Sequence, residues 1–128
     1  MKSPTVVLMS MLVTLLASAC ASTQPITEPV AVIEAFYEAL NDGDLDTAMS
    51  FVADDARFII DILYAGKAEI RDFFREDLDV GSHYEFSDLR ADGEEVSWTA
   101  KATIGAITYE DPYEAVVQEG MIVSFTQD

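Results

Sequence analysis

The chain has 128 residues, a length typical of one globular domain. It carries 24 acidic and 7 basic residues, so its formal net charge is −17. Such a charge excludes nucleic acid as a partner, because nucleic-acid binding depends on the neutralisation of phosphates by lysine and arginine. Solubility is the simplest reason for the charge, and a cationic ligand or partner is the alternative.

The first 19 residues have the pattern of a secretory signal peptide. Lys2 gives a positive start, residues 6–16 are apolar and uncharged, and small residues precede Cys20. The apolar run is too short to span a membrane. Residues 16–20 resemble the bacterial lipobox, which implies cleavage before Cys20 and a lipid on that cysteine. An ordinary signal peptide with an incidental cysteine is the alternative. We therefore predict a protein exported to the cell envelope and anchored to a membrane through Cys20.

After the signal, residues 20–28 form a short polar tether, and residues 29–128 form the domain. The tether would keep the domain close to the membrane. Apolar side chains recur at helical spacing between Ile33 and Leu40, which predicts a first helix over residues 28–40. Asp44 is expected to cap a second helix that ends at Asp54 and Asp55.

The rest of the chain combines a third helix with strands. Residues 56–64 are rich in β-branched and aromatic side chains, which predicts one strand or a tight pair of strands before a helix over 67–78. From residue 83 onwards, apolar side chains alternate with polar ones. This period predicts four strands and one loop: strands 83–90, 95–104, 113–118 and 121–126, and loop 105–112. Helices followed by antiparallel strands indicate an α+β domain.

Three stretches carry a family resemblance: residues 35–56, 66–74 and 114–125. They resemble the nuclear transport factor 2-like (cystatin-like) superfamily and, within it, the SnoaL-like branch. The resemblance extends over residues 29–126 and implies a cone, in which a curved antiparallel sheet wraps around three N-terminal helices and encloses an apolar pocket. It also implies a homodimer formed through the outer sheet face, here the polar side of residues 95–103.

The same resemblance does not select a reaction. The superfamily includes ketosteroid isomerases, polyketide cyclases, epoxide hydrolases and domains that only bind or assemble. The chain has a single histidine and no cluster of carboxylates, histidines or cysteines at metal-ligand spacing. We therefore expect neither a metal nor another cofactor.

Asp61 is the first candidate catalytic residue. It interrupts the apolar stretch 58–64, where a lone carboxylate is costly to bury. Burial would raise its pKa, as suits a general base next to a carbonyl compound. Ketosteroid isomerase has its base in the corresponding region, but that position falls here on Ile60, which would face the other side of a strand. A place in solvent at a hairpin turn is the alternative for Asp61.

Tyr37 and His83 are the other candidate catalytic residues. Tyr37 lies on the apolar face of the first predicted helix and can donate a hydrogen bond into the cone; core packing is the alternative. The catalytic tyrosine of the isomerase corresponds here to Phe36. His83 opens the first long strand, where it either acts as a base tuned to neutral pH or lies in solvent.

An aromatic set is expected to line or fill the cone: Phe36, Phe51, Phe58, Phe73, Phe74, Trp98 and Tyr113. A cavity left between these side chains would suit a flat apolar ligand. We therefore favour a membrane-anchored, non-catalytic domain that binds a small apolar molecule or a protein partner in the envelope. There are two alternatives. One is an isomerase or cyclase with Asp61 as general base, and the other is a structural subunit whose cone is filled by its own side chains.

Overall fold

The computed structural model describes residues 25–128, so the predictions for the signal peptide and Cys20 lie outside the described residues. The elements in chain order are α1 (Pro29–Asn41), α2 (Leu45–Ser50), β1 (Val52–Ile60), β2 (Ile62–Ala65), α3 (Lys67–Asp79), β3 (His83–Asp92), β4 (Glu95–Ile104), β5 (Ile107–Gln118) and β6 (Met121–Gln127). In this part of the chain, no helix is long and apolar enough to cross a membrane.

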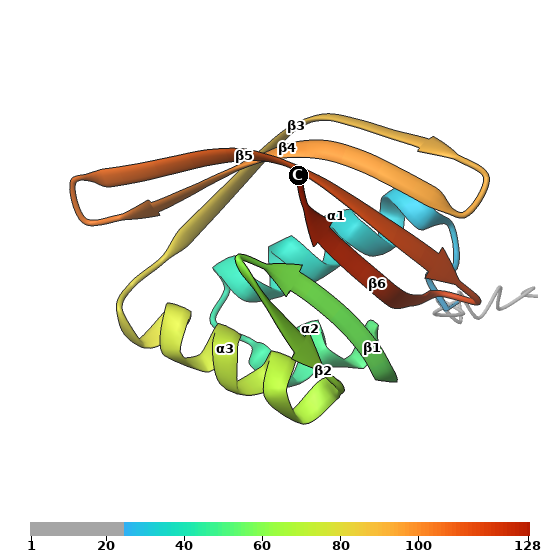
Figure 1. Cartoon of the computed structure of the whole chain (residues 1–128), viewed down its shortest axis with the longest axis horizontal. Coiled ribbons are helices and arrows are strands. Elements are labelled where there is room, and N and C mark those ends of the chain that lie inside the picture. Colours follow the sequence, from blue (N-terminus) through green and yellow to red (C-terminus); the bar gives the residue numbers. More distant parts are fainter. Residues whose placement is uncertain (1–24) are drawn as a thin grey trace, which may run out of the picture.

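The six strands form one sheet in the order β2-β1-β6-β5-β4-β3. Neighbouring strands are antiparallel except for β1 and β6, which pair in parallel. Figure 1 shows the sheet curling over the helices, with α1 under the long strands and α3 beside β1 and β2. This arrangement confirms the predicted α+β fold with a curved sheet around helices.

The curl of the sheet has a local cause in irregular strand pairing. The register of β3 against β4 shifts between Ser87 and Arg90, where Asp88 has a φ of 56°. The register of β5 against β6 shifts between Val116 and Val117. Such bulges bend a strand and increase its twist. The long strands can therefore wrap around α1 and do not extend as a flat layer.

The second predicted helix is shorter than expected. α2 ends at Ser50 and β1 begins at Val52, so Asp54 and Asp55 lie in a strand and do not mark a helix end. Val52 is fully buried and pairs with Ile122 of β6. The pairing with a distant strand therefore decides the boundary, whereas the two exposed aspartates only resemble a local stop signal.

The predicted loop over residues 105–112 is wrong, because β5 begins at Ile107 and continues the β4–β5 hairpin. Ile107 pairs with Ile104, and the ladder runs on without interruption to Pro112. The carbonyl of Pro112 accepts a hydrogen bond from the backbone N–H of Asp128 at 3.0 Å. The nitrogen of a strand residue faces the same side as its carbonyl, so the missing N–H of Pro112 removes no bond to β4.

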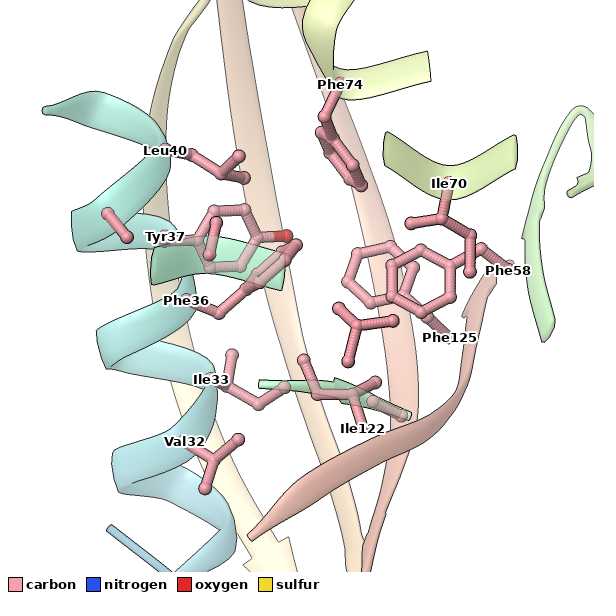
Figure 2. Close-up of a cluster of buried hydrophobic side chains, with 14 of the residues drawn as sticks. Val32, Ile33, Phe36, Tyr37, Leu40, Phe58, Ile70, Phe74, Ile122 and Phe125 are labelled. Carbon is pink, nitrogen blue, oxygen red and sulfur yellow. The ribbon is translucent and has the colours of Figure 1, made fainter. Parts of the chain in front are cut away.

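The core lies between α1 and the inner face of the sheet (Figure 2). Phe36 is fully buried at its centre, with ring centroids 5.4 Å from Phe74 and 6.2 Å from Phe125. Phe58 stacks on Phe125 at 4.6 Å. The apolar stripe predicted for the first helix is confirmed, since all of its members are buried: Ile33, Phe36, Tyr37 and Leu40.

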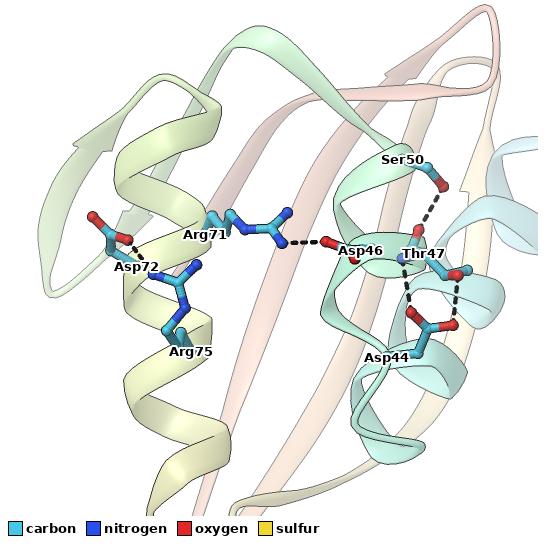
Figure 3. A network of polar contacts seen from close by, with 7 residues as sticks. All are labelled: Asp44, Asp46, Thr47, Ser50, Arg71, Asp72 and Arg75. Atoms are coloured by element: carbon cyan, nitrogen blue, oxygen red, sulfur yellow. Dashed lines mark hydrogen bonds and ion pairs between the residues drawn. The ribbon is translucent and has the colours of Figure 1, made fainter.

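Polar contacts cap α2 and link it to α3 (Figure 3). Asp44 caps α2 as predicted, because its carboxylate accepts a hydrogen bond from the backbone N–H of Thr47 at 3.1 Å. Arg71 of α3 pairs with Asp46 of α2 and so links the two helices. These groups are exposed, and exposed ion pairs contribute only about 0–1 kcal/mol each. The network therefore helps to orient α2 relative to α3 but adds little to the free energy of unfolding.

Candidate functional site

A small cavity lies among α1, α3 and the inner face of the sheet. Its volume is about 70 Å³, and its walls are formed by Tyr37, Ile60, Phe73, Phe74, Asp77, Tyr84, Ala100, Tyr113 and Phe125. A water molecule occupies about 30 Å³ in the liquid, and pockets for drug-sized ligands measure roughly 300–1,000 Å³. The cone is therefore largely filled by its own side chains, and the space that remains suits a group of a few heavy atoms.

The hydroxyl of Tyr37 is held in place by the only tryptophan of the chain. Trp98 Nε1–H donates a hydrogen bond to Tyr37 Oη at 2.9 Å, and both side chains are buried. Figure 2 shows Tyr37 extending from α1 into the interior. Burial raises the pKa of Tyr37, an effect that the bond from Trp98 reduces in part. The phenol is therefore neutral at physiological pH, and its own proton remains available to an acceptor in the cavity.

Tyr84 is a second buried tyrosine that lines the cavity. Its side chain is only 7% exposed, and its oxygen has no hydrogen-bond partner among the described residues. The backbone of Tyr84 is fixed by Asn41, whose side-chain amide donates to the Tyr84 carbonyl and accepts from the Tyr84 N–H, both at 2.8 Å. A buried polar group without a partner calls for a water molecule or a ligand. Tyr84 therefore presents a free hydroxyl on a fixed backbone.

Tyr84→Phe should leave the free energy of unfolding unchanged or raise it by up to about 1 kcal/mol, because the variant removes a buried group that makes no internal hydrogen bond. Urea unfolding measures the change. Tyr109→Phe is the matched control, since Tyr109 is 55% exposed and should show no effect. A loss of more than about 1 kcal/mol in Tyr84→Phe would mean that this hydroxyl is well bonded in the native protein.

Asp77 and Tyr113 add two titratable groups with raised pKa values to the cavity. Asp77 lies in the last turn of α3, and burial raises the pKa of its carboxyl, partly offset by the Ser82 hydroxyl. Tyr113 is half-buried, and burial together with the carboxylates of Asp111, Asp61 and Asp77 raises its pKa to about 12. The cavity thus combines three phenols with one carboxyl that is only partly solvated.

The pKa shift of Asp77 predicts a pH dependence of stability. The folded chain holds the Asp77 proton more tightly than the unfolded chain, in which the pKa of this carboxyl is near 3.8. The proton on Asp77 therefore stabilises the folded state. This contribution to the free energy of unfolding is fully present below the pKa that Asp77 has in the unfolded chain, and it is lost as the pH rises through the raised pKa of the folded chain. Asp77→Asn should increase the free energy of unfolding at pH 7 by a few tenths of a kcal/mol, the scale of partly exposed substitutions.

Urea unfolding of wild type and Asp77→Asn between pH 4 and 7 measures this difference. Asp79→Asn carries the same charge change at an exposed position two residues away and serves as the control. The prediction fails if Asp77→Asn is the less stable of the two variants at pH 7.

The comparison with protein families agrees with this fold. The model described as the SnoaL-like domain matches residues 33–125. The chain belongs to the SnoaL-like family. This confirms the resemblance drawn from the sequence. Among curated proteins, none is detectably similar in sequence.

Solved structures are similar to this SnoaL-like domain at low sequence identity. A protein from Kribbella flavida, provisionally assigned as a ketosteroid isomerase, superposes with a TM-score of 0.71 at 20% identity, over 79% of this chain and 77% of that one. A nuclear transport factor 2-like protein of unknown function from Cytophaga hutchinsonii gives 0.72 at 16% identity, over 84% and 92% of the two chains. An epoxide hydrolase of M. tuberculosis gives 0.66 at 23% identity, over 79% and 81%. These likenesses establish the fold alone.

Asp61 does not lie in the cavity of the SnoaL-like domain, which agrees with the predicted alternative of a hairpin turn in solvent and not with burial. It occupies the turn between β1 and β2, with a φ of 61° and an exposed side chain. The apolar stretch around it is a hairpin and not a single strand, because Ile60 pairs with Ile62. Aspartate tolerates the left-handed conformation that such a turn needs. The general-base role depended on an apolar environment that Asp61 lacks.

His83 also lies outside the cavity. Its side chain is exposed at the start of β3, next to the buried Tyr84. Successive side chains of a strand point to opposite faces, so the inward position of Tyr84 places His83 outside. Of the three candidate catalytic residues, the structure places only Tyr37 at the cavity.

The aromatic set of the SnoaL-like domain divides into two groups. Phe73, Phe74 and Tyr113 line the cavity. Phe36, Phe58 and Trp98 are buried in the packed core, and Phe51 is a half-buried residue at the end of α2. The members of the second group fill the cone, so only part of the predicted aromatic set lines the cavity.

The sequence analysis missed Asp77 and Tyr84, although both leave a signal. Asp77 follows Phe73 by four residues, which places the two side chains on the same face of a helix. Tyr84 and Phe86 alternate with polar residues in β3. No three or more side chains of metal-ligand type gather within residues 25–128.

Proposed function

We propose that this SnoaL-like domain is a non-catalytic binding domain whose site is the cavity between Tyr37, Tyr84 and Tyr113, and that a lipid on Cys20 tethers it to the cell envelope. One observation carries the proposal: Tyr84 lines the cavity, and its buried hydroxyl has no partner among the described residues. A ligand that bonds to this hydroxyl recovers the free energy lost when the group left water, about 1–3 kcal/mol.

The size and chemistry of the cavity restrict the ligand. A volume of about 70 Å³ encloses a few heavy atoms and is too small for a steroid or a polyketide. The lining is mostly aromatic, but it also carries the Asp77 carboxyl and phenol oxygens. The ligand is therefore a small molecule, or one end of a larger one, with an apolar surface and at least one polar atom.

A panel of small compounds tests the proposal on the full chain, purified in mild detergent. The panel contains acetate, acetamide, acetone, tert-butanol and dimethylammonium and trimethylammonium chlorides, and the readout is the melting temperature. A compound at about 100 times its Kd should add roughly 2.7 kcal/mol of stability.

Two valine variants locate the site. Ala100→Val fills the cavity, because Ala100 lines it and is buried. Ala102→Val makes the same change two residues later in β4. Its side chain points to the same face of the sheet, but it does not line the cavity. Stabilisation by a panel compound should disappear in Ala100→Val and persist in Ala102→Val. The proposal fails if no compound stabilises wild type more than Ala100→Val.

An acid–base enzyme is the second candidate, with Asp77 in the role first considered for Asp61. The observation in its favour is the raised pKa of a carboxyl that borders an aromatic cavity containing phenol donors. Acetone fits the cavity and exchanges its protons for deuterium when a base removes them. Faster exchange in D₂O with wild type than with Asp77→Asn, followed by NMR, would favour the enzyme; equal rates would favour binding alone.

The anchor is tested separately. Cys20→Ser removes the sulfur that would carry the lipid, so the protein should move from the membrane fraction to the soluble fraction of the expressing cells. Immunoblotting of the two fractions measures the shift, and Ser22→Ala, in the tether, is the control. A Cys20→Ser variant that stays with the membrane would overturn the lipid anchor.

A further inference from the structure

We propose that the ligand of the cavity is a small alkylammonium ion, held by the Asp77 carboxylate, the surrounding aromatic rings and the Tyr84 hydroxyl. This inference rests on the proposed binding function and specifies the chemical class of its ligand.

The walls of the cavity are mostly aromatic. Six of its nine lining residues are aromatic: Tyr37, Phe73, Phe74, Tyr84, Tyr113 and Phe125. Their rings fall into two contacting groups. Phe73, Phe74, Tyr84 and Tyr37 form a chain with centroids 4.9, 6.4 and 5.7 Å apart, and Tyr113 contacts Phe125 at 5.2 Å. A cation within about 6 Å of a ring centroid is attracted by the ring face, and aromatic cages recognise methylated ammonium groups in this way. In a space of about 70 Å³, any occupant touches several of these rings.

The charges around the cavity are negative. Asp77 lines it, and Asp61 and Asp111 act on Tyr113 together with Asp77. No basic side chain is among the lining residues. The nearest element with several cations is α3, and its Lys67, Arg71 and Arg75 are already paired with Asp54, Asp46 and Asp72. An anion is therefore repelled from the cavity, whereas a cation supplies the opposite charge that no described basic side chain gives to the half-buried Asp77.

The Tyr84 hydroxyl adds a preference for an N–H group. Its oxygen can accept a hydrogen bond, and no described residue donates one. Dimethylammonium and trimethylammonium have an N–H donor, apolar methyl groups and only three or four heavy atoms, so they match the polar atoms, the rings and the volume of the site. Tetramethylammonium lacks the N–H and serves as a comparison.

Isothermal titration calorimetry of the full chain in 0.1 M KCl tests this inference. The probes are dimethylammonium, trimethylammonium and tetramethylammonium chlorides, with tert-butanol as a neutral molecule of similar shape. We expect saturable binding of at least one of the first two. In Asp77→Asn the affinity should fall at least tenfold, and in Asp79→Asn it should stay within twofold of wild type. Tyr84→Phe should weaken the binding of the ions that carry an N–H and leave the affinity for tetramethylammonium unchanged.

Two results would overturn the inference. One is binding of tert-butanol at least as tight as that of trimethylammonium, and the other is an unchanged ammonium affinity in Asp77→Asn. In the first case the proposed binding function still stands if Ala100→Val abolishes the binding of tert-butanol. If no compound of the panel distinguishes wild type from Ala100→Val, the proposed function fails as well. Circular dichroism of each variant establishes that it is folded.

Discussion

Replacing Phe36 by alanine should lower the free energy of unfolding by about 3–5 kcal/mol, which is the range for a buried phenylalanine. Phe36 is fully buried, and four aromatic rings surround it: Tyr37, Phe58, Phe74 and Phe125. These rings come from α1, β1, α3 and β6, so no single element can move to close the space. The variant therefore loses both burial and edge contacts, and keeps most of the cavity that it creates.

Urea unfolding followed by circular dichroism measures this loss. Since domains of this size have a total stability of about 5–15 kcal/mol, Phe36→Ala is expected to lie close to the limit of folding at 37 °C. Phe51→Ala makes the same change at a half-buried position and should cost clearly less. Equal losses in the two variants would contradict a core centred on Phe36.

Tyr37→Phe should cost about 1–3 kcal/mol, because it leaves the buried Trp98 N–H without its acceptor. The ring of Tyr37 remains, so the loss reports on the hydroxyl alone. Tyr84→Phe is the informative comparison: Tyr84 lines the same cavity, but its hydroxyl has no partner among the described residues. The two substitutions are chemically identical and should differ by at least about 1 kcal/mol.

NMR gives an independent check on the Tyr37 hydroxyl. The chain has a single tryptophan, so its indole N–H gives one signal. In Tyr37→Phe this signal should shift and exchange faster with solvent deuterium, whereas in Tyr84→Phe it should change little. Equal costs for the two variants, or an unchanged indole signal in Tyr37→Phe, would mean that the bond between Trp98 and Tyr37 does not form in solution.

Local patterns in the sequence were sufficient for most of the fold. The helical stripe from Ile33 to Leu40 defines α1, because four side chains at that spacing can be buried only together. The breaks between predicted strands at residues 91–94 and 119–120 coincide with hairpin turns, where Gly93, Glu119 and Gly120 have positive φ, as tight hairpins require. These features depend on neighbours in the sequence, so a local argument is enough to find them.

The errors have a common physical origin in strand pairing, which a local pattern of residues does not specify. β1 begins early because Val52 pairs with β6, and β5 begins early because Ile107 pairs with β4. The apolar neighbours of Asp61 allow both a buried position and a turn in solvent, because a hairpin between two apolar strands has the same composition as one buried strand. Nothing local distinguishes these alternatives.

The site is also a product of long-range folding. Asp77, Tyr84 and Tyr113 come from α3, β3 and β5, and they meet only because the sheet curls around α1. The residue types and their inward faces were available in the sequence. Their convergence on one small cavity depends on bulges such as that at Asp88, which no periodicity indicates.

The fluorescence of Trp98 offers the most direct test of the cavity as a binding site. Trp98 bonds to Tyr37, stacks on Tyr113 at 6.0 Å and lies 5.3 Å from Phe125, and these three residues line the cavity. Titration with trimethylammonium chloride at constant ionic strength should change the emission of wild type and Ala102→Val with saturation, and should leave Ala100→Val unchanged. A change that is the same in Ala100→Val and wild type, or that never saturates, would contradict a ligand in this cavity.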